Sequence, residues 1–391
     1  MASSVGRTSR IQVVADFGAV LPSVLAFRFS KRDKNILFLE RESLHVPSSL
    51  EGLEFFRASL KALIDFTDGL GRKTGDKVKN ILVALPNDAV IRSVPRQVRA
   101  TRPHPNLPTS QEELKALWKR ISSPETMGQF MENGTLNHYE PISYELESIE
   151  LDGYPLENSY GASGKELSVS FIATFWPRSY REVVEKIKPA VHSSNLDFMP
   201  RIEALRSYFL FCEGSNASGI FLDIGFRDSL ILVFKDGIIA ASSIFPFGAG
   251  NIMRSIGEHF KLTADNARVI YGQWIRGEAD AGVAGRLDKI ATRQIELWER
   301  ESSFFLGKIA KHHVLNPNIY CTGWGSTLPI LLAELSEPKW REHWSSGSGE
   351  VSVLFPREQI SKIFCNNSIF KTPDDSVLFA LVLRMMQKDI K

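Results

Sequence analysis

The chain has 391 residues, of which 43% are hydrophobic and 24% charged, a composition typical of a folded protein with a large core. Its 47 Lys and Arg residues nearly balance its 45 Asp and Glu residues, so the net charge of +2 argues against nucleic acid as a partner. The cysteines are too far apart to indicate a disulfide framework or a zinc knuckle, and they fit a reducing cytosol: Cys212, Cys321 and Cys365.

One long helix and several strands are predicted at the start of the chain. The strands are expected at Ile11–Ala15, Ser23–Phe29, Asn35–Glu40 and Ile81–Leu85. The helix follows from apolar residues that recur at helical spacing from residue 50 onward, and we expect Gly69 and Gly71 to end it. No signal peptide is indicated, because the first apolar run is short and strand-like.

The composition changes between about residues 80 and 190, where prolines are frequent. We expect a helix at Ser110–Ile121, strands at Tyr144–Asp152 and Leu167–Phe175, and a second helix at Arg178–Ala190. These elements predict a small inserted α+β module. Two charged segments of the module are expected to be solvated surface, a basic arm and an acidic strand: Arg92, Arg96, Arg99 and Arg102, and Glu145, Glu147, Glu150 and Asp152. Alternatively, the arm contacts an anionic membrane or an acidic partner, and the strand receives a basic tail.

The second half of the chain is predicted to open with a three-stranded meander. Its strands are expected at Ile220–Ile224, Ser229–Phe234 and Ile238–Phe245. Helices are then expected at Asn251–Phe260, Ala264–Tyr271 and Gly285–His312, followed by a strand at Asn318–Thr322 and a Leu-rich helix. The last apolar stretch, Val377–Met386, is about half as long as the roughly 20 residues that cross a bilayer, so we expect a packed core helix there.

Two Asp-x-Gly turns follow predicted strands, one in each half of the chain. They are Asp16-Phe17-Gly18 and Asp223-Ile224-Gly225. One such turn is most often an ordinary hairpin, but its recurrence at the start of both halves indicates a duplication. An aspartate near Mg²⁺, together with a glycine-rich hairpin that exposes backbone N–H groups, can hold phosphates.

In this order of elements and motifs, the chain resembles the actin-like ATPase superfamily, in the branch that contains the cell-division protein FtsA and the type IV pilus assembly protein PilM. The resemblance covers nearly the whole chain. It implies an α/β, actin-like (ribonuclease H-like) duplicated fold with an inserted α+β, SHS2-like subdomain in the first half. The implied division is a first lobe at 10–79, the subdomain at 80–190, a return to the first lobe at 191–215, a second lobe at 216–360, and a closing helix at 361–391 that packs on the first lobe.

The resemblance also implies a nucleotide site between the lobes, with ATP and Mg²⁺ as cofactors of active relatives. The positions carried over are Asp16, Gly18, Asp223, Gly225, Gly323 and Gly325. Several neighbours depart from the family pattern, in which small, hydroxyl, acidic and lysine side chains stand instead: Ala19, Phe226, Arg227, Asp228, Arg268, Tyr271 and Trp324. Phe cannot adopt the positive φ of glycine at low cost. Arg227 could compensate for Asp228 or replace the charge of the metal.

We therefore expect a degenerate nucleotide site with no catalytic residues and no resident metal, and at most weak ATPase activity. FtsA-like proteins reach the membrane through a C-terminal amphipathic helix, whereas PilM-like proteins bind the short cytoplasmic segment of a bitopic inner-membrane protein. Here Ser376–Gln387 matches the closing core helix of the family and only Lys388–Lys391 follow, which favours the PilM-like role.

The expected protein is thus a cytoplasmic scaffold, peripheral at the inner face of the membrane, that binds a partner segment and not nucleic acid, with self-association open. The partner is expected to contact the region Glu145–Leu156 or the arm Arg92–Arg102. The alternatives are an FtsA-like division adaptor and an active ATPase that holds Mg²⁺ between Asp16 and Asp223. Fold-level analogy alone does not decide between them.

Overall fold

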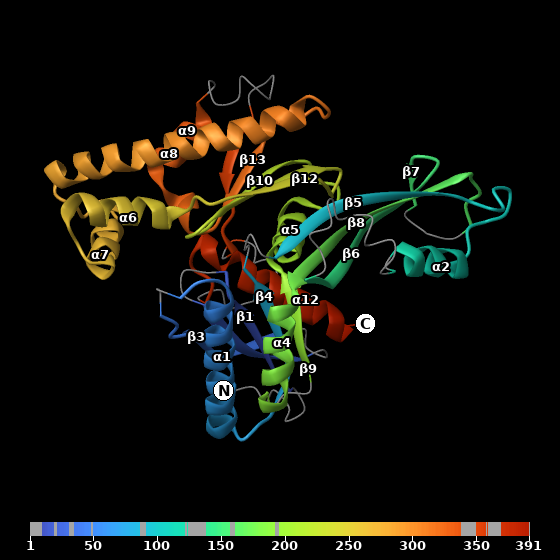
Figure 1. Cartoon of the computed structure of the whole chain (residues 1–391), viewed down its shortest axis with the longest axis horizontal. Coiled ribbons are helices and arrows are strands. Elements are labelled where there is room, and N and C mark those ends of the chain that lie inside the picture. The colour runs from blue at the N-terminus through green and yellow to red at the C-terminus, as the bar shows by residue number, and fades with distance from the viewer. Residues whose placement is uncertain are drawn as a thin grey trace.

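The computed structural model describes residues 10–18, 22–30, 35–47, 50–86, 91–121, 123, 138–156, 161–191, 195–337, 349–356, 358 and 369–390. In these ranges the chain forms two five-stranded sheets and a separate four-stranded sheet (Figure 1). Ala19 and Cys365 lie outside the described residues, and within those residues Cys212 and Cys321 form no disulfide.

The first sheet has the strand order β3-β2-β1-β4-β9. Strand β1 (Ile11–Asp16) pairs antiparallel with β2 (Ser23–Ser30), which pairs with β3 (Asn35–Ser43). On its other side β1 pairs parallel with β4 (Val78–Leu85), and β4 pairs parallel with the edge strand β9 (Asn195–Pro200). The four strands expected from the sequence are confirmed. All of β1 is buried, because helices cover both faces of the sheet.

Helix α1 (Gly52–Thr74) is longer than the sequence predicted. It runs through Gly69 and Gly71 and ends at Gly75, whose φ of 73° is left-handed and whose N–H donates to Gly71 O at 2.9 Å. The predicted stop was wrong because a glycine inside a helix costs only about 1 kcal/mol. Burial of Leu70 in the core outweighs that cost.

Helix α4 (Arg178–Ile187) lies beside α1 on the same face of the first sheet (Figure 1). The rings of Phe56 and Tyr180 join the two helices, with centroids 4.9 Å apart. A short 3-10 helix, η2 (Lys188–Ala190), continues α4, so the predicted helix over 178–190 is found as these two pieces.

The second sheet repeats the pattern of the first, with the order β12-β11-β10-β13-β14. An antiparallel meander is formed by β10 (Gly219–Ile224), β11 (Ser229–Lys235) and β12 (Ile238–Phe245). Strands β13 (Ile319–Thr322) and β14 (Val351–Val353) then add in parallel. The predicted meander is confirmed, and in the order of their pairings the two sheets are duplicates.

Two helices lie between the sheets. They are α5 (Arg201–Glu213) and α12 (Ser376–Ile390), and one hydrophobic cluster joins them to residues of both sheets. Val14 of the first sheet and Phe221 of the second both belong to this cluster. The last helix is therefore a core helix, as expected. None of the helices in the described ranges is long and apolar enough to span a membrane.

Four helices cover the outer face of the second sheet. They are α6 (Ala249–Phe260), α7 (Ala264–Ile275), α8 (Ala281–Ala310) and α9 (Pro329–Ser336). Helix α8 is 30 residues long and runs along the upper side of the molecule in Figure 1.

The third sheet forms the inserted subdomain and has the antiparallel order β5-β8-β6-β7. Its strands are β5 (Arg92–Thr101), β6 (Tyr139–Leu151), β7 (Tyr154–Pro155) and β8 (Glu166–Pro177), with α2 (Gln111–Ile121) packed on one face. The sheet projects sideways from the two lobes (Figure 1). The residue boundaries predicted for the lobes and the subdomain stay predictions.

The basic segment of the subdomain is solvated only in part, since the Arg99 side chain is 67% exposed but Arg102 is buried. It forms strand β5, and Arg102 just after it is buried. The Arg102 guanidinium donates to both carboxylate oxygens of Glu113 at 2.8 Å and to the carbonyls of Leu107 and Gly164 at 3.0 Å. The side-chain hydrogen bond with Arg102 holds the pKa of Glu113 below its usual value.

The acidic strand is likewise not simply a wet face. The buried carboxylate of Glu147 lies 3.1 Å from Arg206 of α5 and accepts a hydrogen bond from Ile239 N–H at 2.9 Å. Glu145 accepts a hydrogen bond from Arg384 of α12 at 2.9 Å. These acidic residues attach the subdomain to the rest of the molecule.

Candidate functional site

Arg201 joins the two predicted aspartates. Asp16 ends β1, Asp223 lies near the end of β10, and both are buried. The Arg201 side chain is only 3% exposed. Its Nη1 donates to Asp16 Oδ1 and Oδ2 at 3.0 and 2.8 Å, and its Nε donates to Asp223 Oδ2 at 2.7 Å. A guanidinium therefore stands between the two carboxylates.

The charges in this cluster depend on one another. Burial opposes the charge of Arg201, but the carboxylates of Asp16 and Asp223 outweigh it and raise the pKa of Arg201 well above its usual value. Burial raises the pKa of Asp16, and Arg201 and the Gly18 N–H, which donates at 2.8 Å, counteract part of that rise. Arg201 thus remains a fixed cation between the lobes.

Sequence reasoning missed Arg201. The residue opens α5, whose following positions are mostly apolar and buried. An arginine at the start of such a helix was a usable signal, because a buried arginine needs a carboxylate partner.

The glycines near this cluster are required by contacts of the chain with itself. A Cβ at Gly18 would lie 2.7 Å from Arg201 Nη1. Gly323 has a φ of 82°, and a Cβ there would lie 2.5 Å from Asp223 Oδ1. A Cβ at Gly325 would overlap the Ile224 side chain. These close approaches explain why three of the predicted positions are glycine, and the explanation requires no bound ligand.

The turn at Gly225 contacts the start of α6. Gly225 O accepts a hydrogen bond from Ala249 N–H at 3.0 Å, and Phe226 O accepts one from Gly250 N–H at 2.8 Å. The N–H groups at a helix N-terminus are common phosphate donors. Here two of them already have partners within the protein.

Aromatic side chains gather beside the turn. The Trp324 ring lies 5.5 Å from Phe226 and 5.2 Å from Tyr271, measured between centroids. Tyr271 is buried. Three of the substitutions that the sequence singled out as departures from the family pattern, Phe226, Tyr271 and Trp324, thus pack around one indole ring.

Arg227 does not supply the cation of this cluster. Its guanidinium lies over the Phe55 ring at 4.5 Å, and Nη2 donates to Leu50 O at 3.2 Å. The hypothesis that it replaces the metal charge was therefore wrong, since Arg201 has the position between the carboxylates. Within the described ranges, no group of three or more His, Cys, Asp or Glu residues could hold a metal ion.

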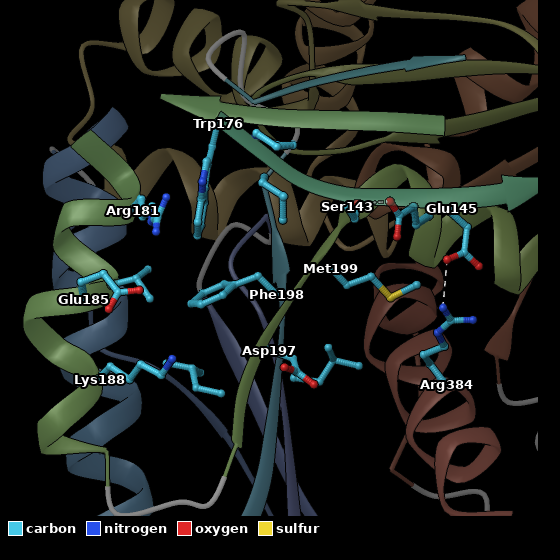
Figure 2. A pocket seen from close by; sticks show the side chains of 16 residues that line it. Ser143, Glu145, Trp176, Arg181, Glu185, Lys188, Asp197, Phe198, Met199 and Arg384 are labelled. Atoms are coloured by element: carbon cyan, nitrogen blue, oxygen red, sulfur yellow. Dashed lines mark hydrogen bonds and ion pairs between the residues drawn. The ribbon is translucent and has the colours of Figure 1, made fainter. Parts of the chain in front are cut away.

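A groove lies along β9, the edge strand of the first sheet. Its volume is about 440 Å³, and it is bordered by α4, α12 and the start of β6 (Figure 2). Trp176 and Phe198 contribute aromatic surface, with ring centroids 5.4 Å apart. Figure 2 shows charged side chains on both sides, namely Arg181 and Glu185 from α4, Lys188 from η2, and Arg384 from α12.

A buried carboxyl lines the same groove. Glu203 is 4% exposed and accepts a hydrogen bond from the Ser143 hydroxyl. Burial raises its pKa to about 7, and the hydrogen bond from Ser143 opposes that rise. The groove thus contains an acid that titrates near neutral pH.

Of the regions expected to contact a partner, only part lines this groove. Glu145 does, and it pairs there with Arg384. The segment Arg92–Arg102 is not among the lining residues.

Solved structures with the same architecture identify the fold. A PilM–PilN type IV pilus biogenesis complex matches 97% of this chain and 99% of that chain, with a TM-score of 0.67 and 14% sequence identity. The chain has the actin-like fold. The predicted fold class and the predicted resemblance to the PilM branch are thereby confirmed at the level of the fold.

Other solved structures match with lower TM-scores. The ethanolamine utilization protein EutJ from Carboxydothermus hydrogenoformans is 12% identical, with 95% of this chain and 89% of that chain covered and a TM-score of 0.46. MreB 5 of Spiroplasma citri bound to AMPPNP is 8% identical, with 98% and 99% covered and a TM-score of 0.45. No protein-family model matches this sequence, and no curated protein matches it.

Proposed function

We propose that this protein is a PilM-like scaffold that holds a short segment of a membrane-anchored partner in the groove along β9. The observation that carries the proposal is an edge strand beside a groove that combines aromatic and charged side chains, in a chain with the fold of the PilM–PilN complex. As in a PilM-like protein, the scaffold is cytoplasmic and reaches the inner face of the membrane through its partner.

The edge strand supplies the backbone part of recognition. In the described part of the chain, β9 is the last strand of its sheet and pairs only with β4. An extended peptide can add to such an edge through main-chain hydrogen bonds, while side-chain pockets give specificity. The partner segment would therefore lie extended beside β9, as a sixth strand of the first sheet.

The groove supplies the side-chain part. Its volume falls within the range of about 300–1,000 Å³ that is usual for binding pockets. Trp176 and Phe198 can receive a large apolar side chain, and such anchors dominate the energy of small interfaces. Lys188, at the start of η2, favours an acidic residue next to that anchor, whereas Arg181 on α4 already pairs with Glu140 at 2.6 Å.

We further propose that the buried cluster around Arg201, between the lobes, is a degenerate nucleotide site. Arg201 lies between Asp16 and Asp223, the two carboxylates that would have to face Mg²⁺ in an active relative. A second cation there would be repelled by the guanidinium. The α6 N–H groups at Ala249 and Gly250 have internal partners, so the residues present do not fit Mg-ATP.

On this proposal the protein does not turn over ATP. One alternative, an active Mg-ATP-dependent ATPase, requires a nucleotide bound between the lobes. The other, an FtsA-like adaptor, requires a different attachment to the membrane.

Site-specific photocrosslinking in cells tests the groove. A photoreactive p-benzoylphenylalanine at Glu185 lies on the groove rim, and the same residue at the exposed Lys186 on α4 is a matched control, because Lys186 does not line the groove. We expect an adduct with an integral membrane protein from position 185 and little or none from 186. Equal adducts from both positions, or none from 185, would contradict the proposal.

A further inference from the structure

Helix α8 presents a basic strip to solvent. Its members follow one another at intervals of three or four residues, which places them on one face of a helix with 3.6 residues per turn. All are exposed, including the two large apolar ones, Leu297 at 46% and Phe304 at 62%. The α8 strip comprises Arg286, Lys289, Arg293, Leu297, Arg300, Phe304, Lys308 and Lys311.

The residues of the α8 strip do not pack in the hydrophobic core. The opposite side of α8 carries the buried residues that pack on the second sheet, among them Leu287, Trp298 and Leu306. None of the acidic residues of the helix lies within the strip: Glu296 and Glu301 border it, and Asp288 and Glu299 lie toward the opposite side.

Most charges of the strip are available to a partner. Arg300 lies 3.8 Å from the Glu301 carboxylate, and Lys308 lies over the Phe304 ring at 4.1 Å. Within the described residues, Arg286, Lys289 and Arg293 form no ion pair. Because the net charge of the whole chain is only +2, this single-sign strip is a local concentration of positive charge.

We infer that the α8 strip is a docking surface for an anionic phospholipid bilayer. Helices that lie in the membrane interface combine Lys and Arg with large apolar side chains, so that the cations meet lipid headgroups and the apolar groups enter the acyl boundary. Phe304 and Leu297 stand between the cations, and Val314, just beyond the helix, is fully exposed. Long Lys and Arg stems allow both kinds of contact at once.

The spacing favours a bilayer over an acidic protein. The strip extends along most of a helix of about 45 Å and spreads six cations over it, with Leu297 and Phe304 at the two turns between them, which matches a plane of diffuse negative charge. It contains no acidic residue that would set the register of a protein partner. Figure 1 shows α8 at the opposite side of the molecule from α4, so the inference does not rest on the groove proposed above.

Vesicle co-sedimentation of the full chain tests this surface. We expect binding to vesicles of phosphatidylcholine with phosphatidylglycerol, no binding to phosphatidylcholine alone, and weaker binding as salt rises. Each basic residue near an anionic surface contributes about fivefold to partitioning, so the double variant Lys289→Glu/Arg293→Glu should lose about 25-fold or more. The double variant Leu297→Ser/Phe304→Ser should also bind these vesicles more weakly, but the dependence of its binding on salt should be unchanged.

The control variant makes the same change of charge at a different surface. Lys61→Glu/Arg72→Glu alters two exposed basic residues of α1 and should bind vesicles as the unmodified protein does. Circular dichroism checks that all variants are folded. Absence of binding to anionic vesicles, an equal loss in the α1 control, or capture of an acidic protein through the strip without any vesicle binding would overturn the inference.

Discussion

The cluster of Asp16, Arg201 and Asp223 predicts a large loss of stability when its cation is removed. Arg201→Met keeps most of the side-chain length but leaves two buried carboxylates without their shared partner. Removing one member of a buried ion pair destabilises a protein by about 3–5 kcal/mol, because an uncompensated charge remains in the interior. We therefore expect the free energy of unfolding to fall by about that amount.

Urea unfolding followed by circular dichroism measures the loss, and a charge-neutral variant tests its cause. Asp16→Asn/Arg201→Met/Asp223→Asn replaces all three charges, and neutral replacement of a buried ion cluster is often close to neutral in stability. It should recover most of the loss. Arg300→Met is a matched control on the surface, where its ion pair at 3.8 Å is expected to contribute less than about 1 kcal/mol. If Arg201→Met unfolds like the unmodified protein, or if the triple variant is no more stable than the single one, the electrostatic reasoning fails.

Two further predictions concern the cleft and the groove. In Arg201→Ala the two aspartates lose their cation, so MgCl₂ should raise the melting temperature of the variant but not that of the unmodified protein, compared at equal ionic strength with NaCl; equal responses would contradict this. Glu203 has a folded-state pKa of about 7 against 4.5 in its ordinary state, so the folded protein binds the extra proton between these values and loses stability as pH rises through that window. The loss amounts to about 3 kcal/mol at most, since one pKa unit is about 1.4 kcal/mol. Burial raises the pKa of Asp374 to about 7 as well, so Glu203→Gln should reduce the stability difference between pH 5 and pH 8 without abolishing it, and an unchanged pH dependence would contradict the role of Glu203.

The duplicated architecture could be predicted because its signals are local. Apolar runs and turns gave the meander, and the recurrence of Asp-x-Gly at Asp16 and Asp223 indicated the two halves before any contact was known. The end of α1 was missed because the effect of Gly69 on helix stability is small, and the burial of the neighbouring Leu70 outweighs it.

The electrostatic features could not be predicted in the same way. Arg201 and Asp16 are 185 residues apart, and nothing local indicates that they meet. The burial of Glu147 likewise depends on Arg206, which belongs to another element. An alternating acidic strand has the same sequence whether its charged face meets water or a neighbouring helix.

The groove was also beyond sequence reasoning. It forms where β9, α4 and α12 come together, and these elements are joined only by the folding of distant segments. Among the expected contact residues whose side chains the structure describes, Glu145 is the one that lines its rim.

A thermal-shift titration with Mg-ATP tests the central claim most directly. That claim is that the protein's own Arg201 occupies the position between the two carboxylates in place of a nucleotide-bound metal. A ligand that binds the native state must stabilise it, by about 2.7 kcal/mol at a hundred times its dissociation constant. We predict that the melting temperature is the same with and without Mg-ATP. A saturable rise that disappears in Asp223→Asn would contradict the account.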